Sequence, residues 1–221
     1  MTLPPFLMGC GNISSPSKSF QDTNADELKR LKEVVLRGIE PSEKDELLLS
    51  EGLDYHTIIK WGEAISDQDT FGFNNDFTCF IPLDKNNPKD GLLWVNHEYI
   101  DPQFVSEFNF MDYEKPLEHR TVEQVDKEMY AVGGSIVRIK EVEGKWHVVK
   151  NDPHNTRLTA QTPITLNWDH PVQGKKTVIG THSNCSGGIT PWNTFLSCEE
   201  NYHSFFGERV YDQNNIPTHT P

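Results

Sequence analysis

Long apolar runs and positive charge are what this sequence has least of. No stretch approaches the roughly 18 consecutive apolar residues that a membrane-spanning helix needs, so we expect no transmembrane helix. Lys and Arg number 20 against 33 Asp and Glu, which gives a formal net charge of −13. A negative surface repels polyanions, which disfavours anionic membrane surfaces as partners and sets nucleic acid aside. Abundant carboxylates are typical of a solvated surface, and they also suit a protein that holds cations.

The common motifs of hydrolases and nucleotide-binding proteins are missing too. The chain contains no Gly-x-Ser-x-Gly elbow, no Walker loop and no His-Glu-x-x-His pair. Its four cysteines, Cys10, Cys79, Cys185 and Cys198, are too few and too scattered for a disulfide framework. The main candidate that remains is a metal site made of carboxylates and a thiolate.

The N-terminal region differs in composition from the rest. Residues 1–22 are rich in Pro, Ser, Asn and Gly, which indicates a leader. Within it, Leu7-Met8-Gly9-Cys10-Gly11 resembles a lipobox, so Cys10 is a candidate for lipidation after export, although the preceding piece is short and has no basic residues. Residues 23–221 should form the folded domain. Apolar spacings of three and four predict a short helix over Asp26–Leu36, with a strand over Val34-Val35-Leu36 as the alternative.

Beyond Pro41 the chain consists of short β-rich runs between turn-forming clusters. The clearest hairpin joins Ser135–Ile139 to Trp146–Lys150 through Glu143-Gly144. Many short antiparallel strands predict an all-β sandwich, barrel or propeller, and the absence of exact repeats leaves that choice open. The expected strands are Leu53–Trp61, Phe77–Ile81, Leu92–Val95, Gly134–Val142, Lys145–Lys150, Thr177–Thr181 and Thr194–Ser197.

Polar side chains sit beside the ends of several expected strands. Asn75 lies in the turn before Phe77, where an ordinary strand-initiating Asx turn is a better explanation than a metal or substrate site. His97 and Glu98 follow an apolar strand directly, and such groups are costly to bury unless they find partners. They are either exposed, or satisfied by a metal or a hydrogen-bond network.

The segment from Gly180 to Asn201 is the most informative. Cys185 precedes a Ser-Gly-Gly turn, and Glu199 and Glu200 follow a short apolar strand. Neighbouring strand residues point to opposite faces, so at most one of the two carboxylates should aim at a common site. A thiolate and carboxylates together could hold a metal cluster. A Cys185–Cys198 disulfide is the structural alternative in an exported protein.

The ordered set of segments from about Pro41 to Asn201 resembles the PhoX-type alkaline phosphatases. Any one motif is weak evidence, and the set in order is strong. In chain order the motifs are Glu51-Gly52-Leu53, Lys60-Trp61-Gly62, Phe73-Asn74-Asn75-Asp76-Phe77, Trp94-Val95-Asn96-His97-Glu98-Tyr99, Gly133-Gly134-Ser135, Gly144-Lys145-Trp146, Asn155-Thr156-Arg157-Leu158-Thr159-Ala160, Asn184-Cys185-Ser186-Gly187-Gly188-Ile189-Thr190-Pro191-Trp192 and Cys198-Glu199-Glu200-Asn201.

The resemblance implies a six-bladed β-propeller that hydrolyses phosphate monoesters with iron (Fe³⁺) and calcium. By matching motifs, Cys185 is the metal-bridging thiolate and Glu200 the catalytic metal carboxylate, with Glu199 as a further metal ligand. Asn75, His97 and Glu98 are expected near the site without assigned roles. It also implies an exported protein, periplasmic, at the cell surface or secreted, which acts as a monomer on a small phosphate ester.

Two departures from the family pattern qualify these expectations. Asn193 stands where the family commonly has Gly. Family members are also much longer, so this chain should supply only the first blades and, alone, be inactive or poorly folded. Two alternative functions stay open: a calcium-dependent β-propeller that binds or scaffolds without turnover, and a related phosphodiesterase.

Overall fold

The computed structural model describes residue 29 and residues 38–108, 120–171, 174–201, 210–211, 213–214 and 217–218. The chain divides into two units, Met1–Tyr55 and His56–Pro221. The predicted leader with Cys10 lies outside the described residues, as does the predicted helix apart from Lys29, which is helical. In the first unit, the described residues 38–55 form turns and irregular backbone. The predicted domain boundary after residue 22 stays a prediction.

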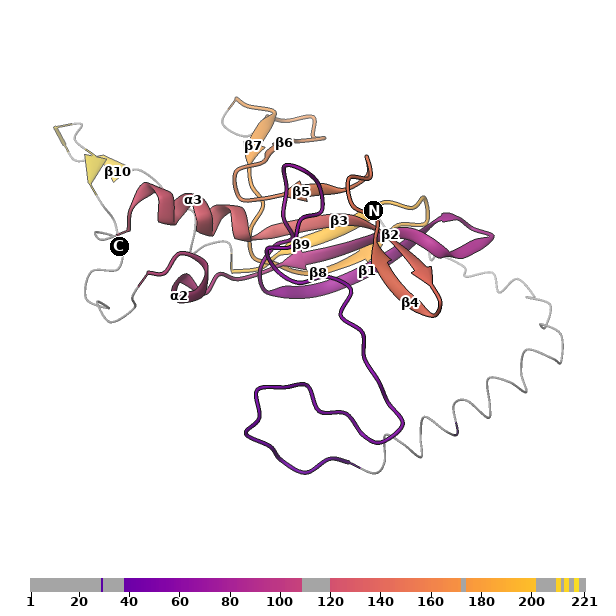
Figure 1. Ribbon diagram of the computed structural model, residues 1–221. Coiled ribbons are helices and arrows are strands. Elements are labelled where there is room, and N and C mark those ends of the chain that lie inside the picture. The colour runs from indigo at the N-terminus through magenta and orange to yellow at the C-terminus, as the bar shows by residue number, and fades with distance from the viewer. Residues whose placement is uncertain are drawn as a thin grey trace, which may run out of the picture. The chain divides into compact units, whose positions relative to one another are not determined.

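The described part of the second unit is built mainly of antiparallel strands, with few helices (Figure 1). This confirms the predicted β class at the level of a mostly β fold. The elements are β1 Asn75–Asp84, β2 Asn87–His97, α2 Pro102–Val105, α3 Val122–Ala131, β3 Gly133–Val142, β4 Lys145–Val148, β5 Thr156–Leu158, β6 Pro163–Thr165, β7 Thr177–Ile179, β8 Asn184–Ile189, β9 Phe195–Glu199, β10 Val210–Tyr211 and β11 Pro217–Thr218.

The largest sheet has five strands in the order β1-β2-β3-β4, with β5 also pairing with β3. Strands β4 and β5 share one edge of β3, because β4 pairs with its residues 139–142 and β5 with residues 134–136. The pairs β6–β7, β8–β9 and β10–β11 form separate two-stranded sheets. Nothing in the described residues forms a helix of the length and apolarity needed to cross a membrane.

The predicted hairpin around Glu143-Gly144 is confirmed as β3–β4. Val142 pairs with Lys145, which leaves Glu143 and Gly144 as a two-residue turn. Both turn residues have positive φ, 51° and 79°, as the tightest hairpin turns require. A local sequence signal was therefore enough to place this element.

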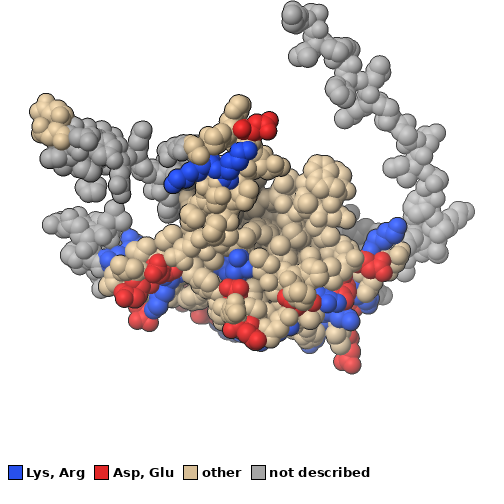
Figure 2. Space-filling model, turned by 90° about the horizontal axis from the view of Figure 1, so that it is seen from above, with Lys and Arg blue, Asp and Glu red and all other residues tan. Residues whose placement is uncertain are grey.

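A small apolar core lies against the five-stranded sheet. It consists of Ile65, Phe71, Val95, Val137 and Ile139, each at most 3% exposed. Burial of such side chains is the main driving force for folding, at about 1.5–3 kcal/mol each. Most acidic and basic side chains lie on the surface, with Asp90, Glu128, Asp152 and Arg157 as buried exceptions. The face in Figure 2 shows the surface charges interspersed.

Two expectations about elements were wrong or incomplete. The described residues 53–61 form no strand, because Ile58 and Ile59 pack against the core without joining a ladder. The helix α3 was not expected. It begins with a capping box in which Thr121 and Gln124 bond each other's backbone N–H groups, a signal that the sequence Thr-Val-Glu-Gln does carry.

Candidate functional site

Four side chains from separate segments converge beside one end of the β1–β2 pair. Asp76 is the second residue of β1, Glu98 follows β2, Cys185 is in β8 and Glu200 follows β9. Potential ligand atoms of Asp76, Glu98 and Cys185 lie within 4.8 Å of one another. Glu200 joins them through hydrogen bonds with the Cys185 thiol and with Glu98. We call these four residues the thiol–carboxylate cluster.

Strand register explains why these residues meet. Asn75 lies opposite His97 in the β1–β2 pair, so the next residues, Asp76 and Glu98, share one end of that pair. In the second hairpin, Asn184 lies opposite Glu199, and an irregularity before Ser186 leaves Cys185 outside the regular ladder. The backbone N–H of Glu200 donates to the carbonyl of Ser183 at 2.9 Å, which holds Glu200 close to Cys185.

The Ser-Gly-Gly segment after Cys185 is part of strand β8, so the predicted turn there is wrong. Gly187 lacks a side chain because its neighbours leave no room. A Cβ atom at this position would lie 2.4 Å from the carbonyl oxygen of Leu196 and 2.6 Å from the ring of Phe77. The glycine thus lets β8 pack closely against β1, and this contact carries Cys185 to Asp76.

A buried asparagine joins β2 to this hairpin. Asn96 is fully buried, and its Oδ1 accepts hydrogen bonds from Trp94 Nε1 at 2.7 Å and from Ser197 Oγ at 2.8 Å. Its Nδ2 donates to the carbonyl of Ser186, next to Cys185, at 3.1 Å. Asn184 extends the network by donating to Ser197 Oγ. Asn96 therefore fixes the position of the hairpin relative to β2.

The crowding of acidic groups affects their protonation. Hydrogen bonding to Asp76, followed by burial and hydrogen bonding to Glu200, raises the pKa of the Cys185 thiol to about 12. Burial and then the charge of Asp76 raise the pKa of Glu98. In the protein alone the Cys185 thiol therefore keeps its proton at neutral pH, and Glu98 holds a proton more strongly than a free glutamate does. A cation would displace the protons and neutralise the clustered charge, so the donor set fits a metal ion.

His97 and Asn75 were expected near the site, and they lie directly beside it in the chain. Their side chains bond each other, with His97 Nδ1 2.9 Å from Asn75 Oδ1. His97 Nε2 lies 2.7 Å from Ser135 Oγ. Burial, followed by the charge of Arg157, lowers the pKa of His97 to about 3, so the ring is neutral. In this structure both residues support the strand ends that carry Asp76 and Glu98.

Glu199 lies apart from the cluster. Its Oε1 accepts hydrogen bonds from Thr181 Oγ1 at 2.6 Å and from the backbone N–H of His182 at 3.2 Å. Glu200 contacts Cys185 instead, as strand alternation predicts for neighbouring residues. The assignment of Glu199 as a metal ligand stays a prediction.

Cys185 and Cys198 are both free thiols, so the alternative disulfide does not form. Cys198 pairs with Ser186 across the β8–β9 ladder and is exposed. Cys185 is half-buried and faces the carboxylates. The two thiols are therefore chemically distinct, and Cys198 can serve as a control for Cys185.

Asp76 is the member of the cluster that sequence reasoning missed as a candidate site residue. The sequence favours strand initiation for its turn and offers Asn75 as the candidate there. One signal was present: Asp76 and Glu98 flank the predicted strands Phe77–Ile81 and Leu92–Val95 on their outer sides. An antiparallel pairing of those strands brings the two carboxylates to the same end.

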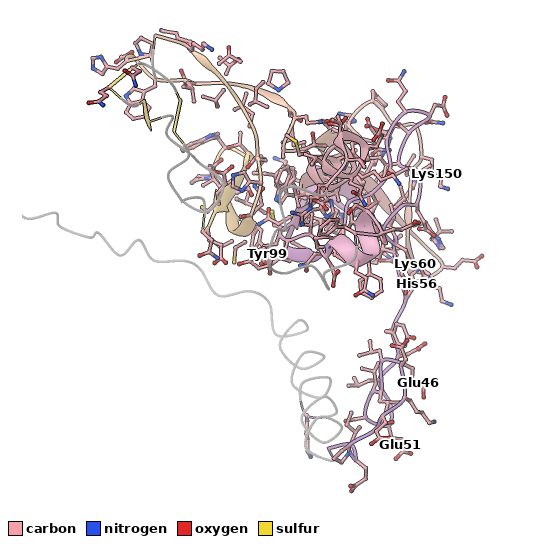
Figure 3. The ribbon with its side chains drawn as sticks, turned by 90° about the vertical axis from the view of Figure 1, so that its left-hand side faces the viewer. Glu46, Glu51, His56, Lys60, Tyr99 and Lys150 are labelled. Carbon is pink, nitrogen blue, oxygen red and sulfur yellow. The ribbon has the colours of Figure 1, made fainter. Side chains whose placement is uncertain are left out.

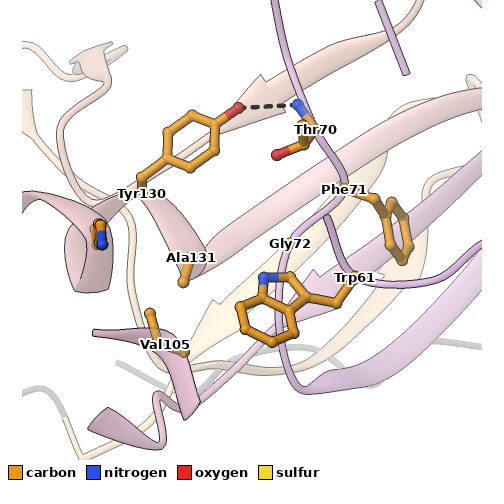
Figure 4. A pocket seen from close by; sticks show the side chains of 8 residues that line it. Trp61, Thr70, Phe71, Gly72, Val105, Tyr130 and Ala131 are labelled. Carbon is orange, nitrogen blue, oxygen red and sulfur yellow. Dashed lines mark hydrogen bonds between the residues drawn. The ribbon is translucent and has the colours of Figure 1, made fainter. Parts of the chain in front are cut away.

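A separate small pocket lies elsewhere in the second unit (Figure 4). It has a volume of about 130 Å³, and the residues lining it include Trp61, Phe71, Val105 and Ala131. Tyr130 hydroxyl accepts a hydrogen bond from the backbone N–H of Thr70 at 3.0 Å at its edge. The cluster residues are not among those that line it.

Comparison with known proteins gives two findings that agree. The family described as alkaline phosphatase PhoX matches residues 35–219. The solved structure of Pseudomonas fluorescens PhoX in complex with vanadate, a transition state analogue, is similar with a TM-score of 0.58 and 24% sequence identity. The match covers 72% of this chain and 30% of that chain. No curated protein gives a significant match.

The family match spans most of the chain and includes all four cluster residues. The structural likeness shows the same fold over the shared part. The chain belongs to the PhoX alkaline phosphatase family.

Proposed function

We propose that this chain contributes part of the active site of a metal-dependent phosphomonoesterase. The observation that carries the proposal is the thiol–carboxylate cluster. Ligand atoms of Asp76, Glu98 and Cys185 lie within 4.8 Å of one another, and Glu200 is hydrogen-bonded to the Cys185 thiol. Membership of an alkaline phosphatase family gives this cluster its chemical context.

Within the proposal, Cys185 and Glu200 hold iron, and Asp76 and Glu98 supply further oxygen ligands to iron or calcium. A soft thiolate suits a transition metal, whereas carboxylates suit calcium. When bound, such cations polarise the phosphoryl group and stabilise the charge that develops on it. The task of Asn96 and His97 is placement: they hold the strand ends so that the four ligand groups need little rearrangement.

The proposed whole enzyme has a six-bladed β-propeller, of which these strands form the first blades. This chain spans 30% of the length of the solved PhoX chain. We propose that the remaining blades add metal carboxylates and basic residues that grip the phosphate. We also propose that the enzyme is exported to the periplasm, the cell surface or the medium, with Cys10 as a lipid anchor.

The decisive test is the iron content of the purified protein after replacement of single thiols. Cys185→Ala should lose iron, because it removes the soft ligand at the centre of the cluster. Cys198→Ala removes an exposed thiol of the same hairpin and should keep the metal. Elemental analysis after removal of loosely bound ions measures both. Retention of iron by Cys185→Ala would refute the proposed centre.

A second candidate function is a calcium-binding module without turnover. It is favoured by one observation, that three of the four cluster groups are carboxylates, which are ligands calcium prefers. Calcium without iron in the same elemental analysis would support it. A panel of phosphate monoesters and diesters separates the phosphomonoesterase from a related phosphodiesterase.

A further inference from the structure

Two side chains outside the cluster, Tyr99 and Asn201, form hydrogen bonds with Glu200. Tyr99, which is labelled in Figure 3, follows Glu98 just after β2. Its hydroxyl donates a hydrogen bond to Glu200 Oε1. The Asn201 amide donates to the same Oε1 at 2.8 Å and to the Tyr99 hydroxyl oxygen at 2.8 Å. The three side chains form a closed hydrogen-bonded triangle.

The triangle is not needed to pair buried polar groups. Tyr99 is 37% exposed and Asn201 is exposed, so water could satisfy both polar groups. Asn201 also has a φ of 49°, in the left-handed region that asparagine tolerates better than most residues. This conformation turns the chain just after Glu200, and the amide lies back against its neighbour.

The triangle restricts the Glu200 side chain from outside the cluster, in addition to its hydrogen bonds with Cys185 and Glu98. A free glutamate must lose rotational freedom when it binds a cation, and that loss weakens binding. Both donors act on Oε1, so they fix the carboxylate while leaving Oε2 without either bond. Partners of this kind orient metal ligands in many proteins, and their loss lowers metal affinity by about 10–100-fold.

We propose that Tyr99 is a positioning residue which, with Asn201, holds Glu200 so that Oε2 is presented to a cation bound by Asp76, Glu98 and Cys185. The inference rests on the proposed function, because it requires a metal at the thiol–carboxylate cluster. The inference goes beyond that function by explaining how the chain orients one ligand, Glu200, before the metal binds.

The test uses Co²⁺ as a spectroscopic probe, titrated into the full chain after metal removal. A thiolate-to-cobalt charge-transfer band reports binding at Cys185. Tyr99→Phe removes only the hydroxyl, and we expect about a 10-fold or greater loss of Co²⁺ affinity with the band retained. The melting temperature of the metal-free protein should stay unchanged. Tyr130→Phe is the matched control, since its hydroxyl bonds Asp69 and Thr70 instead.

A double-mutant cycle shows whether Tyr99 acts through Glu200. In the Glu200→Ala background, Tyr99→Phe should change Co²⁺ affinity by no more than about twofold, which is within the scatter of such cycles. Equal losses in both backgrounds would overturn the inference, because Tyr99 would then act independently. This comparison decides the question even if Tyr99→Phe changes stability.

The remaining outcomes separate this inference from the proposed function. A wild-type chain that binds Co²⁺ with a thiolate band, together with unchanged affinity in Tyr99→Phe, overturns the inference alone. A wild-type chain without a thiolate band overturns the proposed metal centre and the inference with it.

Discussion

At the scale of single residues, buried polar side chains that do not belong to the thiol–carboxylate cluster keep that cluster in place. Asn96 is the clearest case, since it is fully buried and forms hydrogen bonds with Trp94, Ser186 and Ser197. A buried polar group is costly when its partners are missing, so such a network is stable only when it is complete. The requirement for complete pairing makes the position of the Cys185 hairpin specific.

Asn96→Ala should therefore destabilise the protein by about 2–4 kcal/mol, because it leaves several buried groups without partners. Urea denaturation measures the effect. The exposed Asn86, in the β1–β2 turn, offers Asn86→Ala as a control expected to change stability by less than about 0.5 kcal/mol. Equal stability of the two variants would contradict this role of Asn96.

At the scale of elements, an ionic network connects strands β2 and β3 to the turn before β5. Arg138 of β3 donates two hydrogen bonds to Asp90 of β2, at 2.9 and 2.8 Å, and one to Asp152 at 2.7 Å. His154 Nδ1 lies 2.7 Å from the same Asp152. Burial alone would raise the pKa of Asp152, but hydrogen bonds from Arg138 and His154 outweigh it and lower the pKa to about 2.

This network predicts a loss of stability in acid. Because the pKa of Asp152 is lower in the folded state, its contribution is complete above the ordinary value of 3.8 and is lost as pH falls towards 2. Asp152→Asn should reduce stability at neutral pH by about 2 kcal/mol, after allowance for the partial exposure of Arg138. Between pH 4 and pH 2, the stability of Asp152→Asn should also fall by less than that of the wild type.

Urea denaturation at several pH values measures both effects. Asp84→Asn is the matched control, since Asp84 is exposed at the end of β1. A wild-type profile as flat in acid as that of Asp152→Asn would show that the network does not respond to pH in this way.

At the scale of the whole molecule, the second unit carries large apolar side chains that its own elements leave exposed. Trp192 is 74% exposed and Leu196 52%, both in or beside the β8–β9 hairpin, and Ile179 of β7 is 60% exposed. Exposed apolar patches often mark surfaces that other structure covers. The match covers 30% of the solved PhoX chain, so most of that chain has no counterpart in these 221 residues.

We therefore expect the 221-residue chain alone to bind cations without hydrolysing phosphate esters, since the proposed phosphate-gripping residues lie in later blades. A colorimetric assay with p-nitrophenyl phosphate, with iron and calcium added, measures this. Turnover that Cys185→Ala abolishes would prove the expectation wrong and place a complete active site within this chain.

The sequence by itself determined the features that depend on near neighbours. The β3–β4 hairpin follows from Glu143-Gly144 between alternating strands, and the separation of Glu199 from Glu200 follows from the alternation of strand residues. The ordered set of motifs from about Pro41 to Asn201 was also sufficient to indicate the family, which the family match confirms. Local signals of this kind do not require knowledge of the rest of the fold.

The tertiary structure alone added Asp76 to the site and brought the four groups to one place. Asp76, Glu98, Cys185 and Glu200 lie far apart in the chain, and they meet because β1–β2 register, the close approach at Gly187 and the bonds of Asn96 act together. The sequence predicts a turn at Gly187 and Gly188 because glycine has a low preference for strands. They lie in strand β8 because Gly187 packs closely against β1. Contacts over such separations depend on the whole fold, so no local pattern can specify them.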